Sequence, residues 1–136
     1  MIGRWLIIVL LGIGLSLPVH AKDIDGEFAV FGTGSKSCKA YTTARSTRTG
    51  LKDYVVWMEA YLSAFNLIVP STYNIAGNRQ LDDMLKWTDD YCSAHPDDLY
   101  VNAIAALTVA LYPERQNLAP GKDNVEKWKS LKQSGE

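Results

Sequence analysis

The stretch LDDMLKWTDDYC at residues 81–92 carries the clearest structural signal in this 136-residue chain. Apolar residues recur there at three-, four- and seven-residue spacing, and the charged residues fall between them. This spacing predicts an amphipathic helix that turns one face towards a core. Cys92 falls on the apolar face, so this helix should carry one of the chain's two cysteines into the interior.

A second, long helix is predicted over Leu51–Ile68, where apolar residues again follow helical spacing and indicate that most of the helix is buried. Gly50 breaks the chain before it. Pro70 ends it, because proline disfavours the helical conformation in the residue that precedes it.

Two shorter helices complete the prediction. One covers Ser37–Thr47, capped by the hydroxyl of Ser35 or Ser37, although its Thr- and Ser-rich sequence has poor helix propensity. The other starts at His95–Asp98 and runs to Tyr112, with Pro96 at the first helical position and two aspartates at the positive end of the helix dipole. These segments predict an all-α fold, a compact bundle of about four helices.

The N-terminus has the three parts of a secretory signal peptide. Arg4 supplies the positive charge, Trp5–Leu17 is a run without charged residues, and small residues around Ala21 suit cleavage after that residue. The alternative is an uncleaved membrane anchor, but the run is shorter than the roughly 20 apolar residues that span a bilayer. We therefore expect a periplasmic or secreted protein without a stable membrane anchor after cleavage.

This interpretation divides the chain into three parts. Residues 1–21 form the signal peptide, residues 22–113 the helical domain, and residues 114–136 a polar tail in which residues 125–131 could form a short helix. The domain is expected to open with an extended or irregular leader up to Gly34. One domain is what a chain of this length predicts.

Cys38 and Cys92 are the only cysteines, and two thiols that enter an oxidising compartment usually pair. Free buried thiols and an intermolecular bridge are the alternatives. A bridge closing a loop of about 50 residues would stabilise the fold by roughly 4 kcal/mol in the chain-entropy model. It would staple the weak helix at residues 37–47 to the amphipathic helix, and it would remove thiol catalysis.

The composition and motifs argue against several classes of function. A formal net charge of −1 does not support the basic patch that nucleic-acid binding requires. His95 has no neighbours at the spacing of a metal site or a catalytic base. The glycines at residues 32–34 lack the spacing of a phosphate-binding loop. We therefore predict no catalytic residue, no metal site and no cofactor, and hence no enzyme.

Six aspartates come as adjacent pairs in and beside the last two predicted helices. Neighbouring helical residues point in different directions, so these pairs are predicted to be solvated helix faces rather than acid–base pairs. The alternative is an acidic surface that recognises a basic partner or titrates in acid. The pairs are Asp82 and Asp83, Asp89 and Asp90, and Asp97 and Asp98.

The loop at residues 69–78 is the candidate partner-binding segment, because it contains turn residues and an aromatic side chain. Tyrosine is enriched at the centres of protein interfaces, so an exposed Tyr73 would be a plausible anchor. Pro70 and Asn74 are the other candidate residues. A loop tucked onto the bundle is the alternative.

The chain resembles the Rap1a/Tai immunity family over about half of residues 22–136. The segment WMEAYLSAFN at residues 57–66 is followed by Pro70, by the helix at 81–92, by His95-Pro96 and by an Ala-rich helix that Pro113 closes. The cysteines depart from that family's pattern. The resemblance implies an exported helical protein that neutralises a delivered toxin by binding it.

A looser resemblance is to the HdeA-like periplasmic chaperones, small exported helical proteins in which two cysteines join an early helix to a late one. The tail EKWKSLK at residues 126–132 is similar to their Trp- and Lys-rich end. The sequence thus predicts a non-catalytic exported protein that binds a toxin, with an acid-stress chaperone that binds clients and a small exported hydrolase as the alternatives. A homodimer is compatible with each of these.

Overall fold

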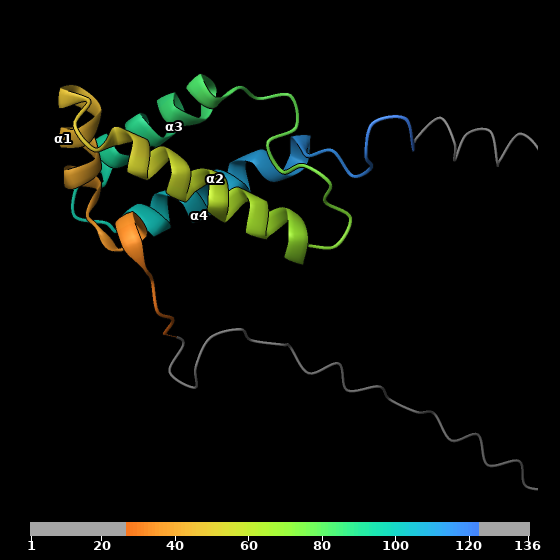
Figure 1. The fold of residues 1–136 in the computed structure, drawn as a ribbon, viewed down its shortest axis with the longest axis horizontal. Coiled ribbons are helices and arrows are strands. Elements are labelled where there is room, and N and C mark those ends of the chain that lie inside the picture. The colour runs from red at the N-terminus through yellow and green to blue at the C-terminus, as the bar shows by residue number, and fades with distance from the viewer. Residues whose placement is uncertain (1–26, 123–136) are drawn as a thin grey trace, which may run out of the picture.

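The computed structural model describes residues 27–122, which form a bundle of four α-helices (Figure 1). The predicted signal peptide and the predicted helix in the tail lie outside these residues. The predicted all-α fold with one disulfide is confirmed. The elements are, in chain order, η1 Gly32–Ser35, α1 Cys38–Thr47, α2 Leu51–Ile68, α3 Leu81–Ala94, α4 Tyr100–Leu111 and η2 Tyr112–Glu114, where η denotes a 3-10 turn.

The helices α1, α3 and α4 pack against one another, and α2 lies across α1 and α4 (Figure 1). The first turns of α2 lie beside α1, and its C-terminal half runs away from α1 towards the C-terminal end of α4. The connecting loop to α3 and the chain after α4 meet at this same end of the bundle.

The disulfide joins Cys38, at the start of α1, to Cys92 on α3. Their Cα atoms lie 4.9 Å apart, and both side chains are buried. α1 is short and rich in Thr and Ser, and its helix propensity is low. The bridge therefore holds a weak helix against a strongly amphipathic one, as the sequence predicts.

A cluster of tyrosine rings fills the centre of the core. Tyr41 from α1, Tyr54 from α2 and Tyr100 from α4 lie with ring centroids 4.9–5.5 Å apart. The Tyr100 hydroxyl donates a 3.3 Å hydrogen bond to the carbonyl of Tyr54, which gives this buried polar atom a partner. Three helices, α1, α2 and the distant α4, thus meet through aromatic contacts.

The chain before α1 crosses α2 and α4 in the turn η1. The Trp57 indole Nε1–H donates to the carbonyl of Phe31 at 2.8 Å. Gly34 lies directly against the same indole, and a Cβ atom at residue 34 would collide with the ring. Glycine is therefore required here by close packing, which pins the leader to α2.

The predicted helix start at His95–Asp98 is wrong, because these residues form a turn and α4 begins only at Tyr100. The carbonyl of Asp98 accepts from the Cys38 N–H at 2.7 Å, and the carbonyl of Pro96 accepts from the Lys39 N–H at 2.9 Å. The first N–H groups of a helix have no acceptor within it. The turn thus caps the start of α1, which no local sequence pattern reveals.

Candidate protein-binding surface

The loop between α2 and α3 is paired with the chain that follows α4. The N–H groups of Tyr73 and Asn74 donate to the carbonyl of Gln116 at 2.8 and 3.1 Å. The Gln116 N–H donates back to the carbonyl of Asn74 at 2.9 Å. This short antiparallel bridge gives the loop a fixed position beside the end of α4.

Ile75 anchors the same loop in the core. Its side chain is fully buried, and its N–H donates a 2.7 Å hydrogen bond to Oδ1 of Asn66 on α2. A buried apolar side chain and a satisfied backbone donor at one residue hold the loop to the bundle. The loop is therefore tucked onto the bundle at Ile75, while Tyr73 and Asn78 are exposed.

The structure places the three predicted binding residues in different roles. Pro70 is exposed, and the side chain of Tyr73 is 49% exposed. Asn74 uses its amide within the loop: Oδ1 accepts from the Ala76 N–H, and Nδ2 donates to the Gly77 carbonyl, both at 3.1 Å. Pro70 and Tyr73 are thus accessible to solvent, whereas Asn74 shapes the turn that follows them.

An ion pair closes the other end of the loop. Arg79 donates from Nε and Nη2 to the two carboxylate oxygens of Glu114 at 2.9 and 2.8 Å. These hydrogen bonds, together with the charge of Arg79, lower the pKa of Glu114. The pair ties the start of α3 to η2, and nothing in the sequence spacing points to it.

Two shallow apolar grooves lie beside this loop and share the ring of Phe65. They have volumes of about 260 and 210 Å³. Val109 lines the first groove and Ile68 the second, and each of these residues is 74% exposed. We call this surface the α2–α4 face and define it by Phe65, Ile68, Val109 and Tyr112.

Sequence reasoning missed the α2–α4 face, although a signal for it exists. Residues 60–78 and 99–113, which supply the end of α2 and all of α4, contain no charged side chain. A helix without charge on any side either is buried all round or presents an apolar surface. In this fold the C-terminal halves of α2 and α4 present an apolar surface.

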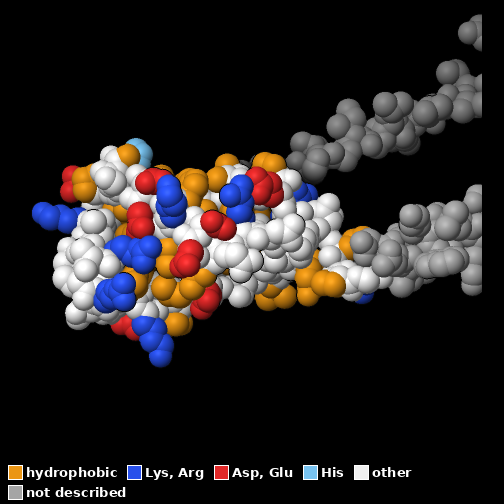
Figure 2. Space-filling view, turned by 90° about the horizontal axis from the view of Figure 1, so that it is seen from above, with side chains coloured by type: hydrophobic (Ala, Val, Ile, Leu, Met, Phe, Trp, Pro, Cys, Tyr) orange, Lys and Arg blue, Asp and Glu red, His pale blue; other side chains and the backbone are white. Residues whose placement is uncertain are grey.

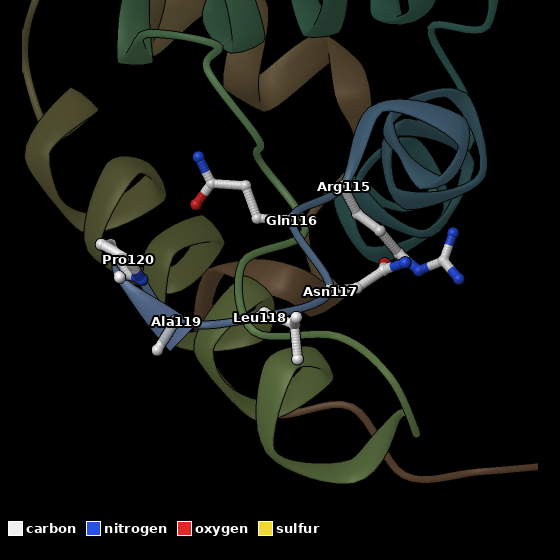
Figure 3. A pocket seen from close by; sticks show the side chains of 7 residues that line it. Arg115, Gln116, Asn117, Leu118, Ala119 and Pro120 are labelled. Carbon is white, nitrogen blue, oxygen red and sulfur yellow. The ribbon is translucent and has the colours of Figure 1, made fainter. Parts of the chain in front are cut away.

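A larger hollow, about 560 Å³, is formed by the chain after η2 (Figure 3). Consecutive residues 115–121 line it, so it is a bend of one segment rather than a cleft between elements. Arg115 is its only charged side chain, and it points away from Gln116. This hollow brings together no pair of groups for acid–base or nucleophilic chemistry.

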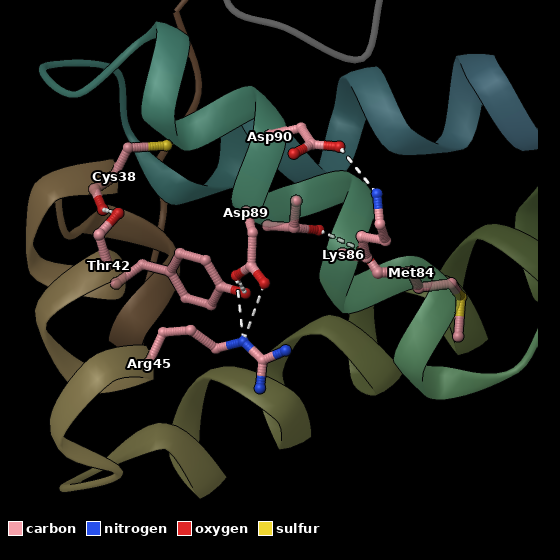
Figure 4. Close-up of polar contacts among 9 residues, drawn as sticks. Cys38, Thr42, Arg45, Met84, Lys86, Asp89 and Asp90 are labelled. Carbon is pink, nitrogen blue, oxygen red and sulfur yellow. Dashed lines mark hydrogen bonds and ion pairs between the residues drawn. The ribbon is translucent and has the colours of Figure 1, made fainter.

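Three of the six paired aspartates serve the fold, which corrects the prediction that these pairs are merely solvated faces. Asp89 on α3 accepts hydrogen bonds from Tyr41 and Arg45 on α1 (Figure 4). Asp98 accepts from the Tyr91 hydroxyl at 2.8 Å, and Asp83 accepts from a backbone N–H at the start of α3. Asp90 pairs with Lys86 one helical turn away, on the surface.

His95 is exposed, with its ring 4.6 Å from that of Tyr91. Among residues 27–122, no three His, Cys, Asp or Glu side chains are grouped to hold a metal ion. Figure 2 shows acidic and basic side chains intermixed on the face in view, without a field of one sign.

A formed disulfide is compatible with an exported protein. No helix within residues 27–122 combines the length and apolar character that crossing a membrane requires.

In comparisons with known proteins, no family model, no curated protein and no solved structure matches this chain.

Proposed function

We propose that this chain is an exported, non-catalytic protein-binding domain of the immunity type, which neutralises a delivered toxin in the periplasm by binding it. The observation that carries the proposal is the loop between α2 and α3. It presents Pro70 and the half-exposed ring of Tyr73 on a backbone held by Gln116 and Ile75.

A loop held in this way suits binding because little conformational entropy is lost when it meets a partner. An aromatic side chain on such a loop supplies contact area with few rotatable bonds. The resemblance to the Rap1a/Tai family supports the same role, as does the N-terminal signal pattern. Asn74 contributes by holding the turn at Gly77.

The test is survival of a deletion strain that is challenged by toxin-delivering neighbours. The deletion strain should die, and the intact gene should restore survival. Tyr73→Ala should not restore it, whereas Leu99→Ala should, because Leu99 is similarly exposed but lies beside Ser37 at the start of α4. Equal amounts of each variant in the periplasm must be confirmed by immunoblot. Normal survival of the deletion strain would refute the immunity role.

A second candidate is an acid-stress chaperone, and one observation favours it. The carboxylates of Asp89, Asp98 and Glu114 each hold a contact between separate segments. Arg79 favours the ionised form of Glu114 and lowers its pKa, so protonation of Glu114 in acid would weaken the contact between η2 and the start of α3. This candidate predicts dye binding and protection of client proteins at about pH 2–3, below the usual carboxyl pKa. Unchanged dye binding and no protection at that pH would eliminate it.

A further inference from the structure

Among residues 27–122, Arg115 has no carboxylate partner. Its guanidinium lies over the ring of Tyr112, with Cζ 3.8 Å from the ring centroid, and Nη1 donates to the Tyr112 carbonyl at 2.9 Å. Its Nε is shielded from solvent and has no acceptor. Arg45 and Arg79 each pair with a carboxylate, whereas no carboxylate among residues 27–122 pairs with Arg115.

This cation stands at the rim of the α2–α4 face. Tyr112 connects the two features, because its ring carries the guanidinium and also lines the groove that contains Phe65 and Val109. The surface therefore combines uncharged apolar grooves with one positive charge at the edge. Apolar patches on a protein surface, especially when polar residues rim them, often mark binding sites.

We propose that the α2–α4 face binds a segment of a partner protein that carries both apolar side chains and a carboxylate. The apolar side chains occupy the two grooves that share Phe65, and the carboxylate pairs with the guanidinium of Arg115. This inference rests on the proposed protein-binding function and names the partner's chemistry. A carboxylate matches the fork of donors that an arginine presents, and it would complement a charge that no carboxylate of residues 27–122 pairs with.

The size of the grooves favours side chains over a small-molecule ligand. Volumes of about 260 and 210 Å³ lie below the roughly 300–1,000 Å³ of typical ligand pockets. Both grooves are open and shallow, which suits the side chains of a polypeptide laid across them. Two neighbouring grooves that share Phe65 could each take one apolar side chain of an amphipathic helix, which binds by placing successive apolar residues in a surface groove.

Charge also argues against a second copy of this chain as the occupant. The lining of the face is uncharged, so a two-fold contact would add an Arg115 from each copy without adding a carboxylate from the face itself. Like charges facing each other oppose association. A partner with an acidic residue beside its apolar ones avoids this repulsion.

The experiment selects 12-residue peptides from a random display library on the full chain with its disulfide intact. The selected peptides should combine apolar residues at helical spacing with Asp or Glu. Synthetic versions should bind Ile68→Lys and Val109→Lys at least about tenfold more weakly than the unmodified protein, a loss equal to about 1.4 kcal/mol. Both residues are largely exposed, so these variants should fold, which circular dichroism checks.

Leu67→Lys is the matched control, because Leu67 precedes Ile68, is 87% exposed and lines neither groove. This variant should bind the peptides as the unmodified protein does. Arg115→Gln should lose the preference for acidic peptides. For each selected peptide, this variant should bind the form that carries Glu no more tightly than a form in which that Glu is replaced by Gln. Equal binding to Ile68→Lys, or selected peptides without acidic residues, would overturn the proposal.

The α2–α4 face could instead bind a second copy of this chain or the chain's own C-terminal residues. Each of these alternatives predicts a distinct result, and either result would refute the proposal. A dimer seen by light scattering that Ile68→Lys dissociates would assign the face to a second copy. Peptide binding by a chain ending at Lys122, but not by the full chain, would assign it to residues 123–136. The survival assay separates this inference from the proposed function. If Ile68→Lys still protects the strain and Tyr73→Ala does not, toxin binding through the loop is supported and the binding role of the α2–α4 face is refuted.

Discussion

The hydroxyl of Tyr41 on α1 donates a 2.7 Å hydrogen bond to Oδ1 of Asp89 on α3, although the tyrosine is fully buried and the aspartate lies near the surface. Arg45 donates to both oxygens of the same carboxylate at 3.1 and 3.0 Å. Burial raises the pKa of Tyr41, and the hydrogen bond to Asp89 raises it further. The neutral hydroxyl therefore remains a donor that joins α1 to α3, independently of the disulfide.

Tyr41→Phe should lower the free energy of unfolding by about 1–2 kcal/mol, because a hydrogen bond to a charged acceptor is lost while the ring packing is kept. The measurement is urea unfolding followed by circular dichroism. Tyr73→Phe is the control, since its hydroxyl has no hydrogen-bond partner among residues 27–122, and it should change stability by less than about 0.5 kcal/mol. Equal effects of the two substitutions would show that the bond to Asp89 contributes nothing.

Replacing both Cys38 and Cys92 by alanine should destabilise the protein by about 2–5 kcal/mol, the usual effect of losing a disulfide that closes a long loop. α1 should suffer most, because its own helix propensity is low. Hydrogen exchange should therefore show the largest loss of protection in residues 38–47. Uniform loss over all four helices would indicate that the bridge stabilises the whole bundle and not α1 in particular.

Gly34→Ala should destabilise the fold by about 1–3 kcal/mol, the usual cost of forcing an extra carbon into a packed site. The added Cβ would collide with the Trp57 indole, so the tryptophan fluorescence should also change. Combining Gly34→Ala with Trp57→Leu should cost less than the sum of the two single changes, because the smaller side chain leaves room. Strict additivity would show that the two residues do not compete for the same space.

Stability should depend on pH through Glu114. Its pKa in the folded state lies below the unfolded value of 4.5, because Arg79 donates hydrogen bonds to the ionised form. The stabilisation is therefore fully present above about pH 4.5 and is lost as pH falls through the lower folded-state pKa.

Melting temperatures of the unmodified protein and of Glu114→Gln should thus differ at pH 6 and converge at about pH 3. Asp90→Asn serves as the control, since Asp90 makes only an exposed contact with Lys86 at 3.8 Å. The pairing of Glu114 with Arg79 would be refuted by a difference that is the same at both pH values.

The sequence predicts those features of the fold that depend on near neighbours along the chain. Helical spacing and Pro70 define α2 with the bounds that the structure has, and Ser37 accepts from the Ala40 N–H as a helix cap should. The apolar face of residues 81–92 places Cys92 in the core, where it meets Cys38. Each of these depends on residues a few positions apart, so periodicity and propensity reveal them.

The candidate binding surface was only partly predictable. Turn residues identify the loop and its exposed Tyr73, but they do not reveal that Gln116 pairs with Asn74 or that Arg79 pairs with Glu114. The uncharged stretches at residues 60–78 and 99–113 could have indicated an apolar surface. Which side of each helix remains uncovered depends on how the helices pack.

The sequence by itself therefore indicated the four helices of residues 27–122, the bounds of α2 and a bridge between the two cysteines, because the hydrophobic pattern and the number of thiols favour them over the alternatives. Tertiary structure decided where α4 begins, which aspartates support the fold and which apolar side chains stay exposed. Pro96 and Asp98 form a turn because their carbonyls meet the unpaired N–H groups of α1. Such contacts join residues distant in sequence, and they arise only when the helices are packed together.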